Sequence, residues 1–306
     1  MSTREELLEV AASPSGGTRP RRRLPLITLS FGIPAAVLIL LLLLYPVYVL
    51  LRMSVSEVKL RNILGEWPIV GLQNYVDLVN DSVFRQVSVQ TVTFLIATVT
   101  VTMVVAFIIG LALTPQTKLS GFAGLLMMLV WTLPLVVVGS MWKFLLATDG
   151  VINALLIGID PISFVSTSTW ALTSIAAVTA WVSIPFSAVV LRSAILDVPT
   201  DVIEAAHVDG AGRRMMIRHI ILPSIWPTLA ILIVLNIVGA FKAFDLIYVM
   251  TKGGPGTSST TIPYLGYLRA FRDFDFGSAA AISILAMLFV LLLSIVYIRG
   301  TSKEHS

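Results

Sequence analysis

Charged residues are scarce in this chain of 306 residues, since Asp, Glu, Lys and Arg make up only 12% of it. A typical soluble domain has about 25% charged residues. Hydrophobic residues account for 57% of the chain, and the mean hydropathy is +0.92. A membrane span needs roughly 20 apolar residues, so the chain holds enough for several spans. This composition excludes a soluble globular enzyme.

Cysteine is absent, which excludes disulfides, thiol catalysis and cysteine metal ligands. The histidines are His207, His219 and His305, and no two of them have the spacing of metal ligands. The net charge of +4 is small for a chain of this size and does not favour nucleic-acid binding. We therefore expect no metal site and no nucleic-acid partner.

The sequence also lacks several motifs that carry chemistry. It has no G-x-x-x-x-G-K-[ST] loop, so we expect no P-loop nucleotide site. G-x-S-x-G and H-E-x-x-H are absent too, and the long apolar runs contain no paired carboxylates. We therefore expect no catalytic residues, no cofactor bound by this chain, and a source of energy in another polypeptide.

Six apolar runs are long enough to cross a membrane and are nearly free of charge. We predict an all-α membrane protein with six transmembrane helices, surrounded by membrane lipid. The domain covers residues 27–299, between a disordered cytoplasmic tail at 1–26 and a C-terminal tail at 300–306. The predicted spans are 27–51, 90–113, 119–142, 169–191, 227–244 and 279–298.

The first run follows basic residues, which raises the alternative of a signal peptide. It is longer than an h-region of about 7–15 residues and no small-residue cleavage site follows it, so we expect an uncleaved span. The arginines at 21–23 lie directly before this span, and positive residues favour the cytoplasmic side. Together with an even number of spans, this predicts a multi-pass membrane protein with both termini in the cytoplasm.

The longest inner connection is residues 192–226, and its stretch 197–223 has the pattern of two short helices separated by a turn. Pro199 is placed for a helix start, residues 202–208 can form the first helix, and Asp209-Gly210 ends it. Residues 213–221 can form the second helix. We call residues 197–223 the knuckle and expect a positive φ at Gly210. One alternative is that its arginines only hold a helix against anionic lipid headgroups.

The order of residues in the knuckle resembles a known family. Glu204-Ala205-Ala206-His207-Val208-Asp209-Gly210-Ala211, followed by Ile220-Ile221-Leu222-Pro223, is similar to the EAA loop of ABC importer permeases. The resemblance implies a type I ABC importer permease fold and a coupling helix that docks on an ATP-hydrolysing subunit. The coupling residues that it implies are Glu204, Ala205, Ala206, Asp209, Gly210, Ala211, Arg214, Ile217, Leu222 and Pro223. The family often has aromatic residues where this chain has Arg214 and Ile217.

The same resemblance implies a location in the bacterial cytoplasmic (inner) membrane and a set of partners. These are a homologous second permease subunit, two ATPase subunits that bind ATP and Mg, and an extracytoplasmic substrate-binding protein. Residues 244–255 and 271–277 are similar to the outer loop of carbohydrate-uptake permeases, specifically the maltose-transporter F type. A carbohydrate substrate is therefore implied, with Gly253, Gly254 and Pro255 in the loop that docks the binding protein.

In the maltose-type relatives, two spans supply the sugar contacts, one of them with a W-x-x-x-P-[FY] motif. The corresponding residues here are Thr179, Val182, Ser183, Phe186, Asn236, Ala240 and Ala243. Amide and hydroxyl groups can hydrogen-bond sugar hydroxyls, and aromatic rings can stack on sugar rings. The alternative is that the polar groups only bridge helices, as Ser, Thr and Asn often do in membranes. Trp131, Trp142 and Trp170 lie near span ends and are interpreted as interface anchors.

Three other functions compete with carbohydrate import through an ABC transporter. A glycerol-3-phosphate or polyol-phosphate permease should carry a cationic group at mid-membrane, and the spans show none. A secondary transporter would need no ATPase, which the EAA-like loop argues against. A membrane enzyme would need a reactive constellation of side chains, and the sequence shows none.

Overall fold

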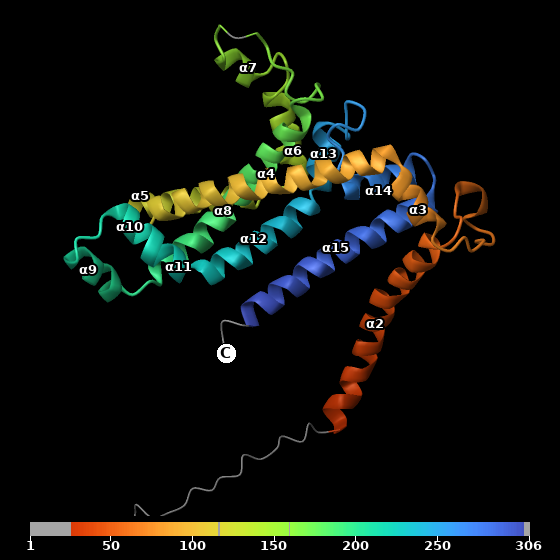
Figure 1. The fold of residues 1–306 in the computed structure, drawn as a ribbon, viewed down its shortest axis with the longest axis horizontal. Coiled ribbons are helices and arrows are strands. Elements are labelled where there is room, and N and C mark those ends of the chain that lie inside the picture. Colours follow the sequence, from red (N-terminus) through yellow and green to blue (C-terminus); the bar gives the residue numbers. More distant parts are fainter. Residues whose placement is uncertain (1–25, 116, 159, 303–306) are drawn as a thin grey trace, which may run out of the picture. The chain divides into compact units, whose positions relative to one another are not determined.

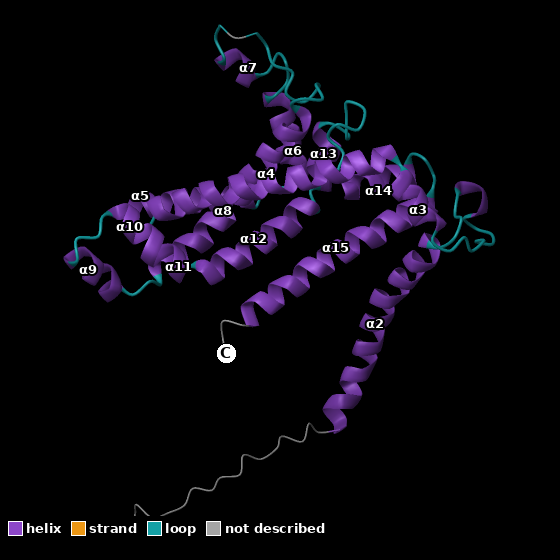
Figure 2. Ribbon diagram, in the orientation of Figure 1, coloured by secondary structure: helices purple, strands orange, loops and turns teal. Residues whose placement is uncertain are grey.

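The computed structural model describes residues 26–115, 117–158 and 160–302, and within these residues the chain is helical with no β-strand (Figures 1 and 2). Two isolated β-bridges, Ser56 with Ile69 and Lys59 with Asp275, are the extended pairings among them. The predicted all-α fold is confirmed. Most of the two predicted tails lies outside the described residues, but helix α15 continues to Ser302 and so enters the predicted C-terminal tail.

The chain divides into two units, residues 1–48 and 49–306. Helix α2 (Leu26–Ser54) begins in the first unit and ends in the second. Only 6% of its segment Val37–Ser54 is buried, and apolar side chains such as Leu41 and Leu42 are more than half exposed. An apolar helix that is exposed all round fits a hydrocarbon environment.

The second unit contains the remaining helices. In chain order they are η2 (Leu60–Asn62), α3 (Gln73–Asn80), α4 (Ser82–Ala112), α5 (Lys118–Trp131), α6 (Leu135–Leu145), α7 (Val151–Leu155), α8 (Ala171–Leu196), α9 (Thr200–Val208), α10 (Arg213–Met216), the π-helical turn Ile217–Ile221, α11 (Leu222–Ser224), α12 (Trp226–Phe241), α13 (Phe244–Met250), α14 (Ile262–Phe271) and α15 (Phe276–Ser302). Helices α4, α5, α8, α12 and α15 form the long part of this unit, with α9 and α10 at one end and α3 and α14 at the other (Figure 1).

Helices α4 and α8 form the tightest pair in the second unit because their contact face carries small residues. Ala106 and Ala188 are fully buried, and a Cβ added to Gly110 would lie 3.1 Å from the carbonyl oxygen of Ala188. Small side chains let two helices approach closely and gain packing contacts in a membrane. Arg192 of α8 donates from Nε to the carbonyl oxygen of Leu113 over 2.7 Å, which satisfies the end of α4.

Four of the predicted spans correspond to single long helices: α2, α4, α8 and α15. The other two predictions need correction, because one span is broken by a bend and the other ends earlier than predicted. The third predicted span, 119–142, is α5 and α6 with a bend of 99° between them, and Pro134 is the N-cap of α6. The fifth predicted span, 227–244, is α12, which ends at Phe241 rather than 244, and the segment Arg213–Ser224 that precedes it is bent by 71° from α12. The described residues thus hold four straight candidate spans, or six if each bent pair is one span.

Candidate translocation and coupling sites

A cavity of about 290 Å³ lies between α5, α8 and α12. Its lining residues are Trp131, Ser183, Phe186, Leu235, Asn236 and Gly239. The structure thus brings together Ser183, Phe186 and Asn236, three of the residues that the sequence predicts for the substrate pathway. The lining contains two polar side chains, two aromatic rings and no charged group, a composition that suits a neutral ligand with hydroxyl groups and an apolar face.

Asn236 is 9% exposed and has its amide nitrogen fully engaged. The nitrogen donates to the Oγ of Ser187 in α8 over 3.0 Å and to the carbonyl oxygen of Leu232 over 2.8 Å. Among the described residues, no hydrogen bond reaches its Oδ1. Asn236 therefore bridges α12 to α8 with one end of its amide and leaves the other end as an acceptor at the cavity.

Ser183 has a similar division of roles. Its hydroxyl donates to the carbonyl oxygen of Thr179 over 2.9 Å, one helical turn earlier in α8. The donor proton is used inside the helix, whereas the oxygen retains lone pairs that can accept a hydrogen bond. The cavity consequently offers two acceptors, on Ser183 and Asn236, which match the O–H donors of a polyol or sugar.

Trp131 lines the cavity, whereas its place near a span end led us to interpret it as an interface anchor. Its ring stacks on Phe186 with centroids 5.2 Å apart and an interplanar angle of 19°, and the side chain is 50% exposed. It closes α5 directly before the 99° bend, so the bend holds the indole beside α8 rather than at a free helix end. The Pro134 that follows was the available signal that the span would break here.

The remaining predicted pathway residues lie elsewhere. Thr179 is 5% exposed and bonds within α8, while Ala240 and Ala243 are 4% and 7% exposed. Both alanines belong to a core cluster with Phe94, Ile175 and Ile247, against which Val182 also packs. These four residues therefore contribute to the packed interior and do not line the cavity of Asn236.

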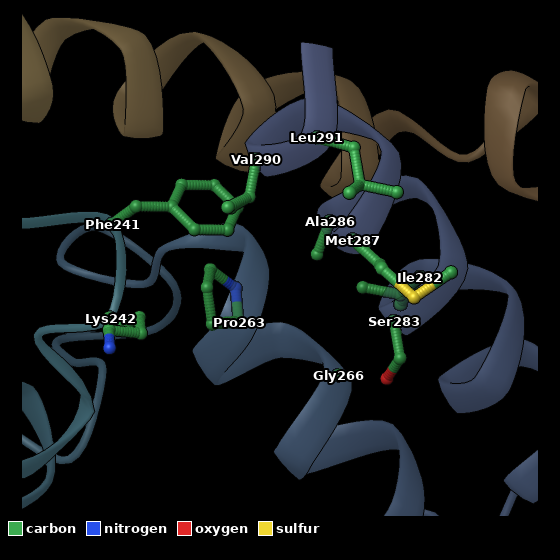
Figure 3. A pocket seen from close by; sticks show the side chains of 10 residues that line it. All are labelled: Phe241, Lys242, Pro263, Gly266, Ile282, Ser283, Ala286, Met287, Val290 and Leu291. Carbon is green, nitrogen blue, oxygen red and sulfur yellow. The ribbon is translucent and has the colours of Figure 1, made fainter. Parts of the chain in front are cut away.

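A larger cavity, about 410 Å³, lies between α12, α14 and α15 (Figure 3). Apolar side chains dominate its wall, among them Phe241, Met287 and Val290, with Lys242 and Ser283 at its edges. It contains none of the predicted pathway residues. Because it lacks paired hydrogen-bonding groups, it is the poorer candidate for a sugar.

The turn of the knuckle has a defined backbone geometry. Helix α9 ends at Val208, and Gly210 has a φ of +77°, as the sequence predicts. The N–H of Ala211 bonds the carbonyl oxygen of Ala206 over 2.9 Å, and the N–H of Gly210 bonds that of His207 over 3.1 Å. These two bonds form a Schellman motif, in which glycine supplies the left-handed residue after the helix.

The side chains of Glu204 and Ala205 in α9, and of Asp209 directly after it, are exposed. Val208 is 87% exposed and Val202 is 46% exposed, although both are apolar. Clustered apolar exposure next to carboxylates is typical of a protein interaction surface. The motif residues on the second half of the knuckle divide: Arg214 and Pro223 are exposed, whereas Ile217 and Leu222 are half-buried.

The knuckle is anchored to the long helices by an apolar cluster. Met216 and Ile221 are buried in this cluster together with Leu191 and Ile195 of α8. Partly buried residues packed against the same cluster include Ile203 of α9, Ile217, and Phe186 of the cavity. A continuous set of packed side chains therefore connects the knuckle to the Asn236 cavity.

The loop at 251–261 is closed by its own hydrogen bonds. Gly253 has a φ of +79°, and its carbonyl oxygen accepts from the hydroxyl of Thr260 over 3.0 Å. Ser259 donates to the carbonyl oxygen of Gly254 over 2.7 Å, while Pro255 is exposed. Tyr264 packs beside Gly253. The pKa of Tyr264 is raised, mainly because the side chain is buried and secondly because Tyr267 and Tyr248 lie nearby. The loop thus presents a preformed surface.

Residues 102–299 match the family model described as the inner membrane component of binding-protein-dependent transport systems. The chain is 30% identical over 237 residues to the trehalose/maltose transport system permease protein MalF of Thermococcus litoralis, covering 76% of this chain and 80% of that protein. It is 29% identical over 307 residues to the diacetylchitobiose uptake system permease protein DasB of Streptomyces coelicolor, covering 95% and 92%.

A solved structure shows the same fold. It is the crystal structure of a bacterial ABC transporter involved in the import of the acidic polysaccharide alginate. The TM-score is 0.75 at 22% sequence identity, with 89% of this chain and 95% of that chain covered.

Proposed function

The chain belongs to the family of inner membrane components of binding-protein-dependent transport systems, and we propose that it forms half of the translocation pathway of an ATP-driven importer for a carbohydrate. The observation that carries this proposal is the Asn236 cavity, which combines two hydrogen-bond acceptors with a stacked aromatic pair. Relatives named for trehalose/maltose and diacetylchitobiose transport support a di- or oligosaccharide as the substrate.

The cavity chemistry favours a neutral sugar. A pyranose ring presents C–H groups on its face and O–H groups at its edge, so it can lie on Trp131 while its hydroxyls donate to Ser183 and Asn236. None of the lining residues is cationic, and an anionic substrate such as glycerol-3-phosphate would lose its hydration there without a charged partner. Neutral carbohydrate is therefore preferred over a polyol phosphate.

Coupling to ATP is assigned to the knuckle. We propose that exposed Glu204, Val208 and Asp209 on and beside α9 dock on an ATPase subunit, where ATP and Mg are bound. Closure of two ATPase subunits would then move the knuckle and, through the cluster around Met216 and Phe186, the cavity wall. This chain itself would contribute pathway and coupling, without covalent chemistry.

The remaining partners and the orientation complete the proposal. A homologous permease would supply the other half of the pathway, and an extracytoplasmic binding protein would dock on the loop with Gly253, Gly254 and Pro255. The knuckle would face the cytoplasm, as would both termini. Since the chain has no cysteine, Leu64→Cys, between the first and second predicted spans, should react with an impermeant maleimide from outside intact cells and Val208→Cys should not. The reverse pattern would contradict this orientation.

The substrate proposal is tested by Trp131→Ala in the assembled transporter. Uptake of maltose, trehalose and diacetylchitobiose would be measured in proteoliposomes and normalised to assembled complex, first to find a transported sugar. Loss of one stacked aromatic face should lower that uptake several-fold, since such pairs contribute about 0.5–1.5 kcal/mol. Trp131→Phe retains a ring and should recover most of the uptake. Equal normalised uptake in wild type and Trp131→Ala would refute the stacking role.

A further inference from the structure

The two halves of the knuckle carry opposite charge. Acidic residues Asp201, Glu204 and Asp209 lie on or beside α9, and all three are exposed. The following segment, Arg213–Ser224, which we call the basal segment, has only basic charged residues, and each of them is exposed. They are Arg213, Arg214, Arg218 and His219. Within the described part of the chain, no ion pair involves these basic groups.

Three of the four basic residues surround one hollow. This hollow has a volume of about 360 Å³ and is lined by Gly212, Arg214, Met215, Arg218 and His219. Arg214 and Arg218 are four residues apart and so lie on the same face of the segment. Arg213 belongs to the same segment but does not line the hollow. The hollow therefore concentrates two guanidinium groups and an imidazole around a space without a carboxylate.

The opposite face of the basal segment is apolar. Met216 and Ile221 are buried in the cluster with α8, and Ile217 and Ile220 are half-buried against it. Charged and apolar faces on opposite sides are typical of a helix at a membrane interface. Met215 beside the arginines is 57% exposed, so the hollow also has an apolar edge.

The orientation of the basal segment relative to α12 indicates how deep the segment lies in the membrane. Its axis is bent by 71° from α12, so it runs closer to the membrane plane than to the normal if α12 is a span. Trp226, the first residue of α12, is 55% exposed at this corner. Tryptophan prefers the headgroup level of a bilayer. In Figure 1, α9 lies at the extreme end of the second unit, beyond α10 and α11.

We propose that the hollow of Arg214, Arg218 and His219 binds the headgroup phosphate of an anionic phospholipid in the inner leaflet. The guanidinium groups would donate charge-assisted hydrogen bonds to the phosphate, and Met215 would lie beside the first acyl carbons. The acidic α9 would be repelled by the same surface and held away from it. The inference rests on the proposed function only for the cytoplasmic position of the knuckle.

The test uses the purified full chain in neutral detergent, titrated with phosphatidylglycerol or phosphatidylcholine, with bound lipid counted by native mass spectrometry. Wild type should retain phosphatidylglycerol in preference to phosphatidylcholine. Since a basic residue near an anionic surface contributes about 1 kcal/mol, each arginine removed should weaken binding about fivefold. Arg214→Gln with Arg218→Gln should therefore weaken it about 25-fold. Arg213→Gln removes the same charge outside the hollow and should retain wild-type binding.

Three further arms make the result decisive. Arg214→Lys with Arg218→Lys should recover part of the binding, which separates loss of charge from loss of folding. Inorganic phosphate at millimolar concentration should not displace the lipid, and displacement would identify free phosphate as the ligand. Unchanged lipid binding in the double Gln variant would overturn the proposal. If that variant also lost association with the ATPase subunit, the two arginines would be assigned to ATPase docking instead. Lipid binding is measured without sugar or ATPase, so a failure of the transport proposal would leave the result of this test unchanged.

Discussion

Two turns, one in the 251–261 loop and one in the knuckle, depend on glycine in opposite surroundings. Gly253 and Gly210 have nearly the same φ, +79° and +77°. A Cβ on Gly253 would lie 2.6 Å from the Thr260 hydroxyl and 2.8 Å from the Tyr264 ring, whereas a Cβ on Gly210 would have no atom within 4 Å. The first turn is completed by its own chain. The turn at Gly210 has no such packing from its own chain, as expected of a surface that a partner covers.

The largest effect should come from Gly253→Ala. The substitution combines a left-handed backbone with a contact shorter than side chains tolerate, so Thr260 and Tyr264 must move. We expect Tm to fall by several degrees and stimulation of ATPase activity by the binding protein to be lost. Differential scanning fluorimetry and ATPase assays of the complex would measure both.

Gly256→Ala is the matched control for Gly253. Gly256 also has a positive φ, +61°, but a Cβ there would meet nothing within 4 Å. It should carry only the backbone cost, with a much smaller fall in Tm. Equal effects of the two substitutions would show that packing around Gly253 does not complete the loop.

Gly210→Val should have the next largest effect, through the backbone alone. The left-handed conformation costs a residue with a Cβ about 1–2 kcal/mol, so the Schellman turn would be populated about 5–30-fold less relative to alternatives. We expect weaker ATPase-subunit association in pull-down experiments, with Tm of the isolated chain almost unchanged. Gly210→Asn, which tolerates this conformation, should retain association. A large fall in Tm with Gly210→Val would mean that the turn is as closed as that of Gly253.

Substitution of Asn236 should give the smallest effect, because only one end of its side chain is bonded within the protein and the other end faces the cavity. Its amide nitrogen donates hydrogen bonds to Ser187 and to the carbonyl oxygen of Leu232, while its Oδ1 is available as an acceptor at the cavity. Asn236→Leu should lower both Tm and normalised sugar uptake, the latter several-fold, since one neutral hydrogen bond contributes about 0.5–1.5 kcal/mol.

Ser187→Ala separates the two roles of Asn236, because Ser187 is buried and does not line the cavity. It should lower Tm and leave uptake per assembled complex at the wild-type value. If Asn236→Leu also left uptake per complex unchanged, Asn236 would be only a bridge between α12 and α8.

Comparison of the sequence predictions with the structure shows which features are local. The long apolar runs gave α2, α4, α8 and α15 because roughly 20 apolar residues suffice for a span whatever their neighbours are. The turn at Asp209-Gly210 was equally accessible, since a helix end with glycine is encoded within a few residues. The run 119–142 is predicted as one uninterrupted span, yet it bends by 99° between α5 and α6, where Pro134 is the N-cap of α6.

Hydrophobic length and short motifs need no distant partner, so the amino-acid sequence was enough to predict a helical membrane protein, its family resemblance, the two-helix pattern of the knuckle and its glycine turn. Packing between the helices, in contrast, sets which residues meet at the cavity. It turned Thr179, Ala240 and Ala243 into the core and brought Trp131 from α5 onto Phe186 of α8. Which face of a uniformly apolar helix is buried depends on the packing of small residues such as Gly110 against Ala188, and hydropathy does not record that choice.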